Sequence, residues 1–100
     1  SRLVCEHITL DRDARDAFND GKLVDLTVKE FDLMELLMRS REMVLTKENL
    51  ILKLWGYESD AEDNNVEVYI SFLRRKLTHL HSAVTIRTRR MVGYFLEVEA

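Results

Sequence analysis

Hydrophobic positions between residues 64 and 81 repeat with the period of an α-helix. The apolar side chains recur at spacings of four, three, four and three residues, which places them along one side of a helix. This stripe consists of Val66, Ile70, Leu73, Leu77 and Leu80. Asp63 is a candidate N-cap, with Asn64 and Asn65 in the first turn. The pattern therefore predicts an amphipathic helix over residues 64–81.

The side of this helix opposite the stripe has an unusual composition. At about 100° per residue, the opposite side holds Val68, Ser71, Phe72, Arg75 and His79, with Arg74 and Lys76 on its two flanks. A solvated helix face typically holds Glu, Lys and Gln instead. A helix lying in a DNA groove needs apolar groups for thymine methyls, a small polar group near base edges, and cations for phosphates. The face therefore favours DNA contact.

Two shorter helices are predicted before this one. Thr27 and Glu30 have the spacing of a capping box, and the helix that follows runs to about Ser40. Thr46 is a second candidate N-cap, and Gly56 is suited to end the helix Lys47–Trp55. The expected buried residues of these helices are Phe31, Met34, Leu37 and Met38, then Leu50, Ile51 and Leu54.

Short alternating runs at both ends of the chain indicate β-structure. Residues 3–5, 8–10, 14–18 and 23–26 predict a four-stranded antiparallel sheet, with a tight turn at residues 19–21. Residues 84–88 and 94–98 predict a hairpin with residues 89–93 at its tip, after an apolar connector at residues 43–45. The order of sheet, three helices and hairpin predicts an α+β fold, a winged helix-turn-helix in which residues 1–100 form one domain.

Composition adds that the chain is a single small domain with 46% apolar residues. No apolar run approaches the roughly 18 residues of a membrane span, so we expect no membrane partner. The single cysteine, Cys5, excludes an internal disulfide framework and favours a reducing, cytoplasmic compartment. Because the sequence starts at Ser1 without an initiator Met, we expect a piece of a longer protein.

The net charge of −3 conceals a segregation of charge. Residues 1–68 contain nine Lys/Arg and sixteen Asp/Glu, whereas residues 69–96 contain six Lys/Arg and no acid. Positive charge gathered at one end of a chain attracts nucleic acid to that end, whatever the net charge of the whole chain. The alternative is an ordinary solvated basic patch.

Catalytic and metal-binding patterns are not evident in the sequence. The three histidines, His7, His79 and His81, have no Cys or carboxylate partners at ligand spacing. There is no Gly-rich phosphate loop or nucleophile motif. We therefore expect no metal, no cofactor and no enzymatic activity.

Five runs in the chain resemble the C-terminal effector domain of OmpR/PhoB-type response regulators. They lie at residues 26–31 (LTVKEF), 54–57 (LWGY), 66–70 (VEVYI), 73–77 (LRRKL) and 92–94 (VGY), in the family's order. The resemblance implies a bacterial two-component transcription factor whose receiver domain, absent from this sequence, is phosphorylated through a sensor histidine kinase. It also implies head-to-tail pairs on direct-repeat DNA, with the third helix in the major groove and the wing in the minor groove.

The resemblance also implies roles for particular residues. Together with the exposed face and the basic hairpin, it gives the expected DNA-binding set: Asn64, Asn65, Val68, Tyr69, Ser71, Phe72, Arg74, Arg75, Lys76, Arg87, Thr88, Arg89 and Arg90. The loop expected to contact RNA polymerase consists of Trp55, Gly56, Tyr57, Glu58, Ser59, Asp60, Ala61, Glu62 and Asp63.

Several positions depart from the family pattern. Tyr69 stands where His is frequent, and Phe72 stands where Arg or another polar residue is frequent. In the wing, Met91 replaces a Gly, which costs conformational freedom at the tip, while Arg87 and Arg89 add positive charge. We expect a wing of altered shape with stronger phosphate attraction, and a half-site different from that of relatives.

Other interpretations of these residues remain open at the level of sequence. Tyr69 and Phe72 can be satellite core residues packed on the wing, and Trp55 can be a core anchor, a DNA contact or both. Arg74 and Lys76 can be solubilising charges. The alternative function is a winged-helix protein-interaction module that docks through an exposed apolar patch without direct DNA binding.

Overall fold

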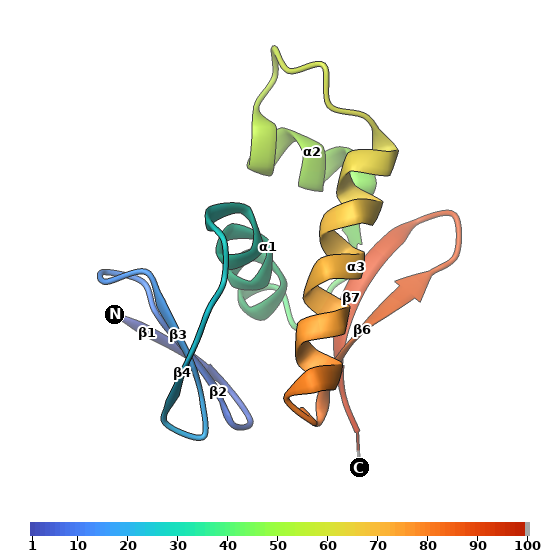
Figure 1. Ribbon diagram of the computed structural model, residues 1–100. Helices are drawn as coiled ribbons and strands as arrows, with labels where there is room; N and C mark the ends of the chain where they lie inside the picture. The colour runs from blue at the N-terminus through green and yellow to red at the C-terminus, as the bar shows by residue number, and fades with distance from the viewer. Residues whose placement is uncertain (100) are drawn as a thin grey trace.

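The computed structural model describes residues 1–99 and contains a four-stranded sheet, three helices and a three-stranded sheet, as expected for a winged helix. The elements in chain order are β1 Arg2–Cys5, β2 Ile8–Asp11, β3 Asp16–Asn19, β4 Lys22–Val24, α1 Val28–Arg39, β5 Leu45–Thr46, α2 Lys47–Trp55, α3 Asp63–His79, β6 Val84–Arg89 and β7 Gly93–Val98. The N-terminal sheet lies beside α1, and the β6–β7 hairpin lies on the other side of α3 (Figure 1).

The N-terminal sheet is an antiparallel meander in the order β1-β2-β3-β4. Its third strand begins at Asp16, and the prediction of residue 14 was wrong. The reason is a turn in which the Asp11 carboxylate accepts hydrogen bonds from the backbone N–H groups of Asp13 and Ala14 at 3.1 Å. The predicted tight turn at residues 19–21 is confirmed, because Asn19 pairs with Lys22 across two residues of positive φ, which is hairpin turn geometry. The last strand ends at Val24, before the predicted residue 26.

The helix boundaries of α1 and α2 follow from their caps. Thr27 accepts a hydrogen bond from the Glu30 backbone N–H at 3.3 Å, and Glu30 accepts one from the Thr27 N–H at 2.8 Å. This capping box confirms the predicted start of α1. Thr46 accepts from the Asn49 N–H at 3.1 Å to begin α2, which ends at Gly56 with φ 94°. Glycine is favoured there because other residues rarely adopt positive φ.

Residues 43–45, expected to be only a connector, contribute a strand to the wing. Leu45 and Thr46 pair with Tyr94 and Gly93, which gives a sheet in the order β5-β7-β6. At Gly93 a Cβ atom would lie 1.9 Å from the Leu45 carbonyl oxygen, so this pairing requires glycine. Two paired residues are too few to produce a visible alternation in the sequence. The start of α2 is thereby fixed to the wing.

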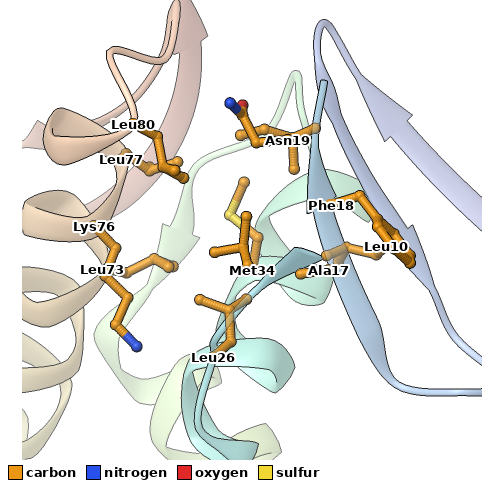
Figure 2. A pocket seen from close by; sticks show the side chains of 12 residues that line it. Leu10, Ala17, Phe18, Asn19, Leu26, Met34, Leu73, Lys76, Leu77 and Leu80 are labelled. Carbon is orange, nitrogen blue, oxygen red and sulfur yellow. The ribbon is translucent and has the colours of Figure 1, made fainter. Parts of the chain in front are cut away.

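The predicted apolar stripe of α3 forms the centre of the core. Val66, Ile70, Leu73 and Leu77 are buried, and Leu80 is half-buried beyond the end of the helix. Figure 2 shows the seam where α3 meets α1 and the N-terminal sheet, with apolar side chains facing one another across it. The space left at this seam is about 20 Å³, which is room for one water molecule at most.

One ion pair joins the buried side of α3 to α1. The Lys76 ammonium donates to a Glu30 carboxylate oxygen at 2.6 Å and to the Asp25 carbonyl oxygen at 2.7 Å. Glu30 is only 2% exposed. Burial raises the pKa of the Glu30 carboxyl, but the hydrogen bonds from Lys76 and from Thr27 outweigh it, so the pKa is lowered overall. A lowered carboxyl pKa stabilises the folded state above the ordinary pKa, and this stabilisation is lost as the pH falls through the folded-state value.

We predict that Lys76→Met lowers the free energy of unfolding by about 1–2 kcal/mol at neutral pH, a value discounted because Lys76 is partly exposed. The substitution leaves the Glu30 carboxylate buried without its cation. The deficit should shrink as the pH falls below the ordinary carboxyl value of 4.5, because a protonated Glu30 needs no cation. Urea unfolding across this pH range measures it.

Lys53→Met is the matched control, since it removes the same charge from an exposed position of α2. It should change stability by less than about 0.5 kcal/mol at every pH. Equal losses in the two variants, or a Lys76→Met deficit that persists in acid, would contradict the structural role of the ion pair.

Candidate nucleic-acid interface

The exposed face of α3 is the one that the helical periodicity predicts. Val68 is 45% exposed and Phe72 is 40% exposed. Ser71, Arg75 and His79 are also exposed. The face therefore combines apolar, hydroxyl and cationic groups on a helix whose other side is locked into the core. No acidic residue lies among these five positions, and the exposed acid beside them, Glu67, is paired with Lys47, which favours approach to a polyanion.

The start of α3 differs by one residue from the prediction. Glu62, and not Asp63, is the N-cap, and the helix ends at His79 before the predicted residue 81. The cause at the N-terminus is Asn65, whose side-chain oxygen accepts a hydrogen bond from the Glu62 backbone N–H at 2.7 Å. Asn64 and Asn65 are both exposed in the first turn. The side-chain oxygen of Asn65 is thus engaged in capping.

Arg74 ties the exposed face of α3 to the wing. Its Nε donates to the Ile86 carbonyl oxygen at 2.9 Å, and its Nη2 donates to the Thr88 hydroxyl at 2.7 Å. The guanidinium also lies 5.7 Å from the centroid of the Tyr94 ring. Arg74 therefore does more than add charge, because it holds the helix and the wing side by side. Sequence reasoning missed this role, since nothing in the residue pattern shows which backbone a flanking arginine will reach.

The wing ends in a short loop that carries Arg90, whereas Arg87 and Arg89 lie on β6. Arg89 pairs with Gly93, so the loop proper is residues 90–92, shorter than the predicted tip. The Val92 N–H donates to the Arg89 carbonyl at 3.0 Å, and Met91 has φ 65°. This is the third position of a type II turn, which normally requires glycine. Met91 therefore adopts a backbone conformation that is unfavourable for a residue with a side chain, whereas the family's glycine adopts it freely.

Charged side chains around the wing are partly paired. Arg87 lies 3.8 Å from Glu97, and the Arg89 guanidinium lies 5.9 Å from the Phe95 ring centroid. Arg90 is exposed at the tip. Near the first turns of α3, Lys47 donates to Glu67 at 2.9 Å. This hydrogen bond raises the pKa of the Lys47 ammonium. It also places a cation beside the Glu67 carboxylate on α3.

Three aromatic rings run from the end of α2 onto the exposed face. The Trp55 and Tyr69 ring centroids are 5.8 Å apart, and those of Tyr69 and Phe72 are 5.7 Å apart in an edge-to-face arrangement. Trp55 and Tyr69 are partly buried against the core. Tyr69 is thus a satellite of the core that packs on Trp55, not on the wing. Lys29 lies 5.4 Å from the Trp55 ring centroid and donates to the Leu54 carbonyl.

The loop expected to contact polymerase projects away from the rest of the domain between α2 and α3 (Figure 1). Trp55 is the last residue of α2 and Asp63 is the first of α3, so the loop itself is residues 56–62. Tyr57 is 90% exposed in it, and Glu58, Asp60 and Glu62 give it a negative charge.

Lys76 stands apart from the other candidate DNA contacts. Its ammonium is directed to Glu30 and Asp25 on the side of α3 away from the wing. This arrangement does not support the predicted phosphate contact, because the cation already compensates a buried carboxylate. The periodicity placed Lys76 on a flank of the helix, but periodicity alone does not identify the partner beside that flank.

Within residues 1–99, no group of three or more His, Cys, Asp or Glu side chains comes together as a metal site would require. In the same range, no helix has the length and apolar character of a membrane span.

A helix-turn-helix with an exposed second helix, followed by a basic hairpin, defines a winged-helix DNA-binding domain. Residues 21–96 match the family model described as "Transcriptional regulatory protein, C terminal". The chain is 44% identical to the response regulator ArlR of Staphylococcus saprophyticus over 87 residues, which are 87% of this chain and 40% of ArlR. It thus spans about two fifths of the curated relatives that it matches.

Solved structures agree with this match. The DNA-binding domain of RstA from Klebsiella pneumoniae, described in complex with the RstA box, superposes with a TM-score of 0.80 at 28% identity, covering 95% of each chain. The DNA-binding domain of AdeR, in complex with an intercistronic region, gives a TM-score of 0.85 at 25% identity, covering 95% of this chain and 98% of that domain. The chain belongs to the family of C-terminal effector domains of OmpR/PhoB-type response regulators, which are DNA-binding transcription regulators.

We predict that Met91→Gly stabilises the domain by about 0.5 kcal/mol. Glycine relieves the left-handed backbone at this 97% exposed position, worth about 1–2 kcal/mol, and part of the gain is lost to its greater freedom in the unfolded chain. Val92→Gly is the control in the same loop, where φ is not positive, and it should destabilise. Urea unfolding of both variants tests the contrast, and a destabilising Met91→Gly would refute the turn geometry.

Proposed function

We propose that the domain binds direct-repeat operator DNA, with α3 in the major groove and the β6–β7 wing at the adjacent minor groove. The observation that carries this proposal is the exposed apolar and basic face of α3, which Arg74 holds beside the basic wing. A major groove about 12 Å wide admits one α-helix. The helix supplies base contacts and the wing supplies charge, as two parts of one rigid surface.

The proposed phosphate contacts lie mainly on the wing. Arg90 is exposed at its tip, and Thr88 and Arg89 are exposed on β6. Arg74 adds positive charge where helix and wing meet, and Arg75 adds it on the helix. Asn64 and Asn65 are placed to contact DNA from the start of α3. We leave Lys76 out of the phosphate contacts because of its ion pair with Glu30.

The remainder of the proposal concerns the longer protein. Relatives such as ArlR are response regulators of which this chain spans two fifths. We propose that the chain is the effector part of a cytoplasmic bacterial response regulator controlled by a sensor histidine kinase through a receiver domain. Two copies would bind head to tail. Sequences selected from a random DNA pool should then contain two half-sites of the same orientation, spaced by one helical turn of about 10–11 base pairs.

We predict that Arg90→Ala weakens binding to all DNA sequences by a similar factor. It should also lower the slope of log affinity against log salt by about 0.9, the effect of one phosphate contact. Fluorescence anisotropy with a labelled duplex at several salt concentrations measures both quantities. Arg2→Ala is the matched control, because it removes an arginine from the edge strand of the N-terminal sheet.

The control should leave the salt slope unchanged. If Arg74→Ala combined with Arg90→Ala left the DNA affinity at about 0.15 M salt untouched, the proposed interface would be wrong. Salt-insensitive capture of a protein, without any shift of DNA, would select the alternative of a protein-interaction module.

We further propose that residues 55–63 recruit RNA polymerase through Tyr57 and the acids around it. The prediction is that Tyr57→Ser leaves the dissociation constant for DNA within about two-fold, because the loop lies outside the proposed DNA-binding face. The same variant should reduce the shift of the protein–DNA complex by added RNA polymerase. An unchanged polymerase shift would remove this loop from the proposal without affecting DNA binding.

A further inference from the structure

We infer that the middle of α3 reads thymine, through apolar contact of Val68 and Phe72 with the 5-methyl groups of two thymines in the major groove. This inference rests on the proposed function and specifies the bases that its central contacts select. It starts from the two partly exposed apolar side chains that occupy the centre of the DNA-facing surface.

The chemistry of the face excludes the other bases at its centre. Guanine is read by the paired donors of Arg or Lys, adenine by the amide of Asn or Gln, and cytosine by a carboxylate. The exposed positions between Asn65 and Arg75 are Glu67, Val68, Ser71 and Phe72, and the Glu67 carboxylate is already paired with Lys47. A serine hydroxyl bonds to any base, so discrimination there comes from the apolar groups. Thymine is the base that offers an apolar group in the major groove.

The neighbouring cations are held away from this centre. Arg74 donates to Ile86 and Thr88 on the wing side of the helix. Lys76 pairs with Glu30 on the opposite side. Both side chains would have to break hydrogen bonds to reach a base beside Val68. The structure therefore keeps the Arg74 and Lys76 side chains away from the bases beside Val68.

Both apolar side chains are held in defined positions. Phe72 packs edge-to-face on Tyr69 with ring centroids 5.7 Å apart, and the Arg75 guanidinium lies 6.0 Å from the centroid of the Phe72 ring. Tyr69 is in turn held by Trp55. Val68 is β-branched, and such a residue has one strongly preferred rotamer in a helix. Little side-chain freedom is then lost on binding, which favours the contact.

The spacing along the helix sets the expected spacing of the bases. Val68 and Phe72 are one turn apart, which is about 6 Å along the helix axis. Successive bases on one strand rise by about 3.4 Å. The two thymine methyls should therefore lie within about two base steps of each other in each half-site.

The experiment removes single methyl groups from the DNA. A duplex selected from a random pool by the unmodified protein is prepared with each thymine replaced, one at a time, by deoxyuridine, which keeps base pairing and lacks only the 5-methyl group. Affinity is measured for each duplex. We expect a loss of about two- to four-fold at two positions per half-site, the effect of one partly buried methyl group, and less than 1.5-fold elsewhere.

Protein variants assign each methyl to a side chain. Val68→Ala should abolish the effect of uracil at one position, and Phe72→Ala at the other. Val4→Ala is the matched control, because Val4 is an exposed valine on the N-terminal sheet, and it should keep both effects. Phe72→Leu covers the case in which loss of the ring disturbs Tyr69, since a leucine still contacts a methyl.

The outcomes separate the inference from the function on which it rests. If DNA is selected and bound but no thymine is sensitive to uracil, the inference is overturned and the DNA-binding function stands. The same holds if the sensitivities persist unchanged in both Val68→Ala and Phe72→Ala. If no DNA is selected, the proposed function itself fails.

Discussion

Burial of the apolar stripe of α3 is the constraint on which the rest of the structure depends. Val66, Ile70, Leu73 and Leu77 are almost completely inaccessible, and each contributes about 1.5–3 kcal/mol relative to exposure. Rotating the helix by one residue would move these groups by about 100° and expose them. The rotation of α3 about its own axis is therefore fixed, and so is the set of side chains that it presents outward. The residues on the exposed face of α3 are therefore determined by the packing of its buried face.

The sequence specifies this part of the structure well because helical periodicity and capping are local. The stripe of α3, the capping box at Thr27 and the glycine end of α2 were all confirmed. Two of the features that the sequence missed depend on partners distant in sequence. Lys76 meets Glu30 across 46 residues, and β5 pairs with residues of the wing far along the chain. No periodicity within one segment reports such contacts, and a two-residue strand leaves no pattern of its own.

Electrostatics in this domain is a matter of placement, not of total charge. Acids outnumber bases in the chain as a whole, yet several acids are paired locally, including Asp32 with Arg15 and Glu67 with Lys47. Exposed pairs of this kind add little stability. Glu67 lies on α3 itself, and its pair with Lys47 places a cation beside the acid there. A net charge of −3 is then compatible with attraction of DNA to one face.

The aromatic contacts connect the two regions to which separate roles are assigned. Trp55 ends α2 where the projecting loop begins, and it packs on Tyr69, which packs on the exposed Phe72. Each such contact is worth about 0.5–1.5 kcal/mol beyond simple burial. A movement of the loop that displaces Trp55 would therefore loosen Phe72, and ordering of Phe72 against DNA would favour one position of Trp55. Linkage between two sites is reciprocal. A protein bound to the loop and DNA bound at Phe72 would therefore stabilise the same arrangement of the three rings.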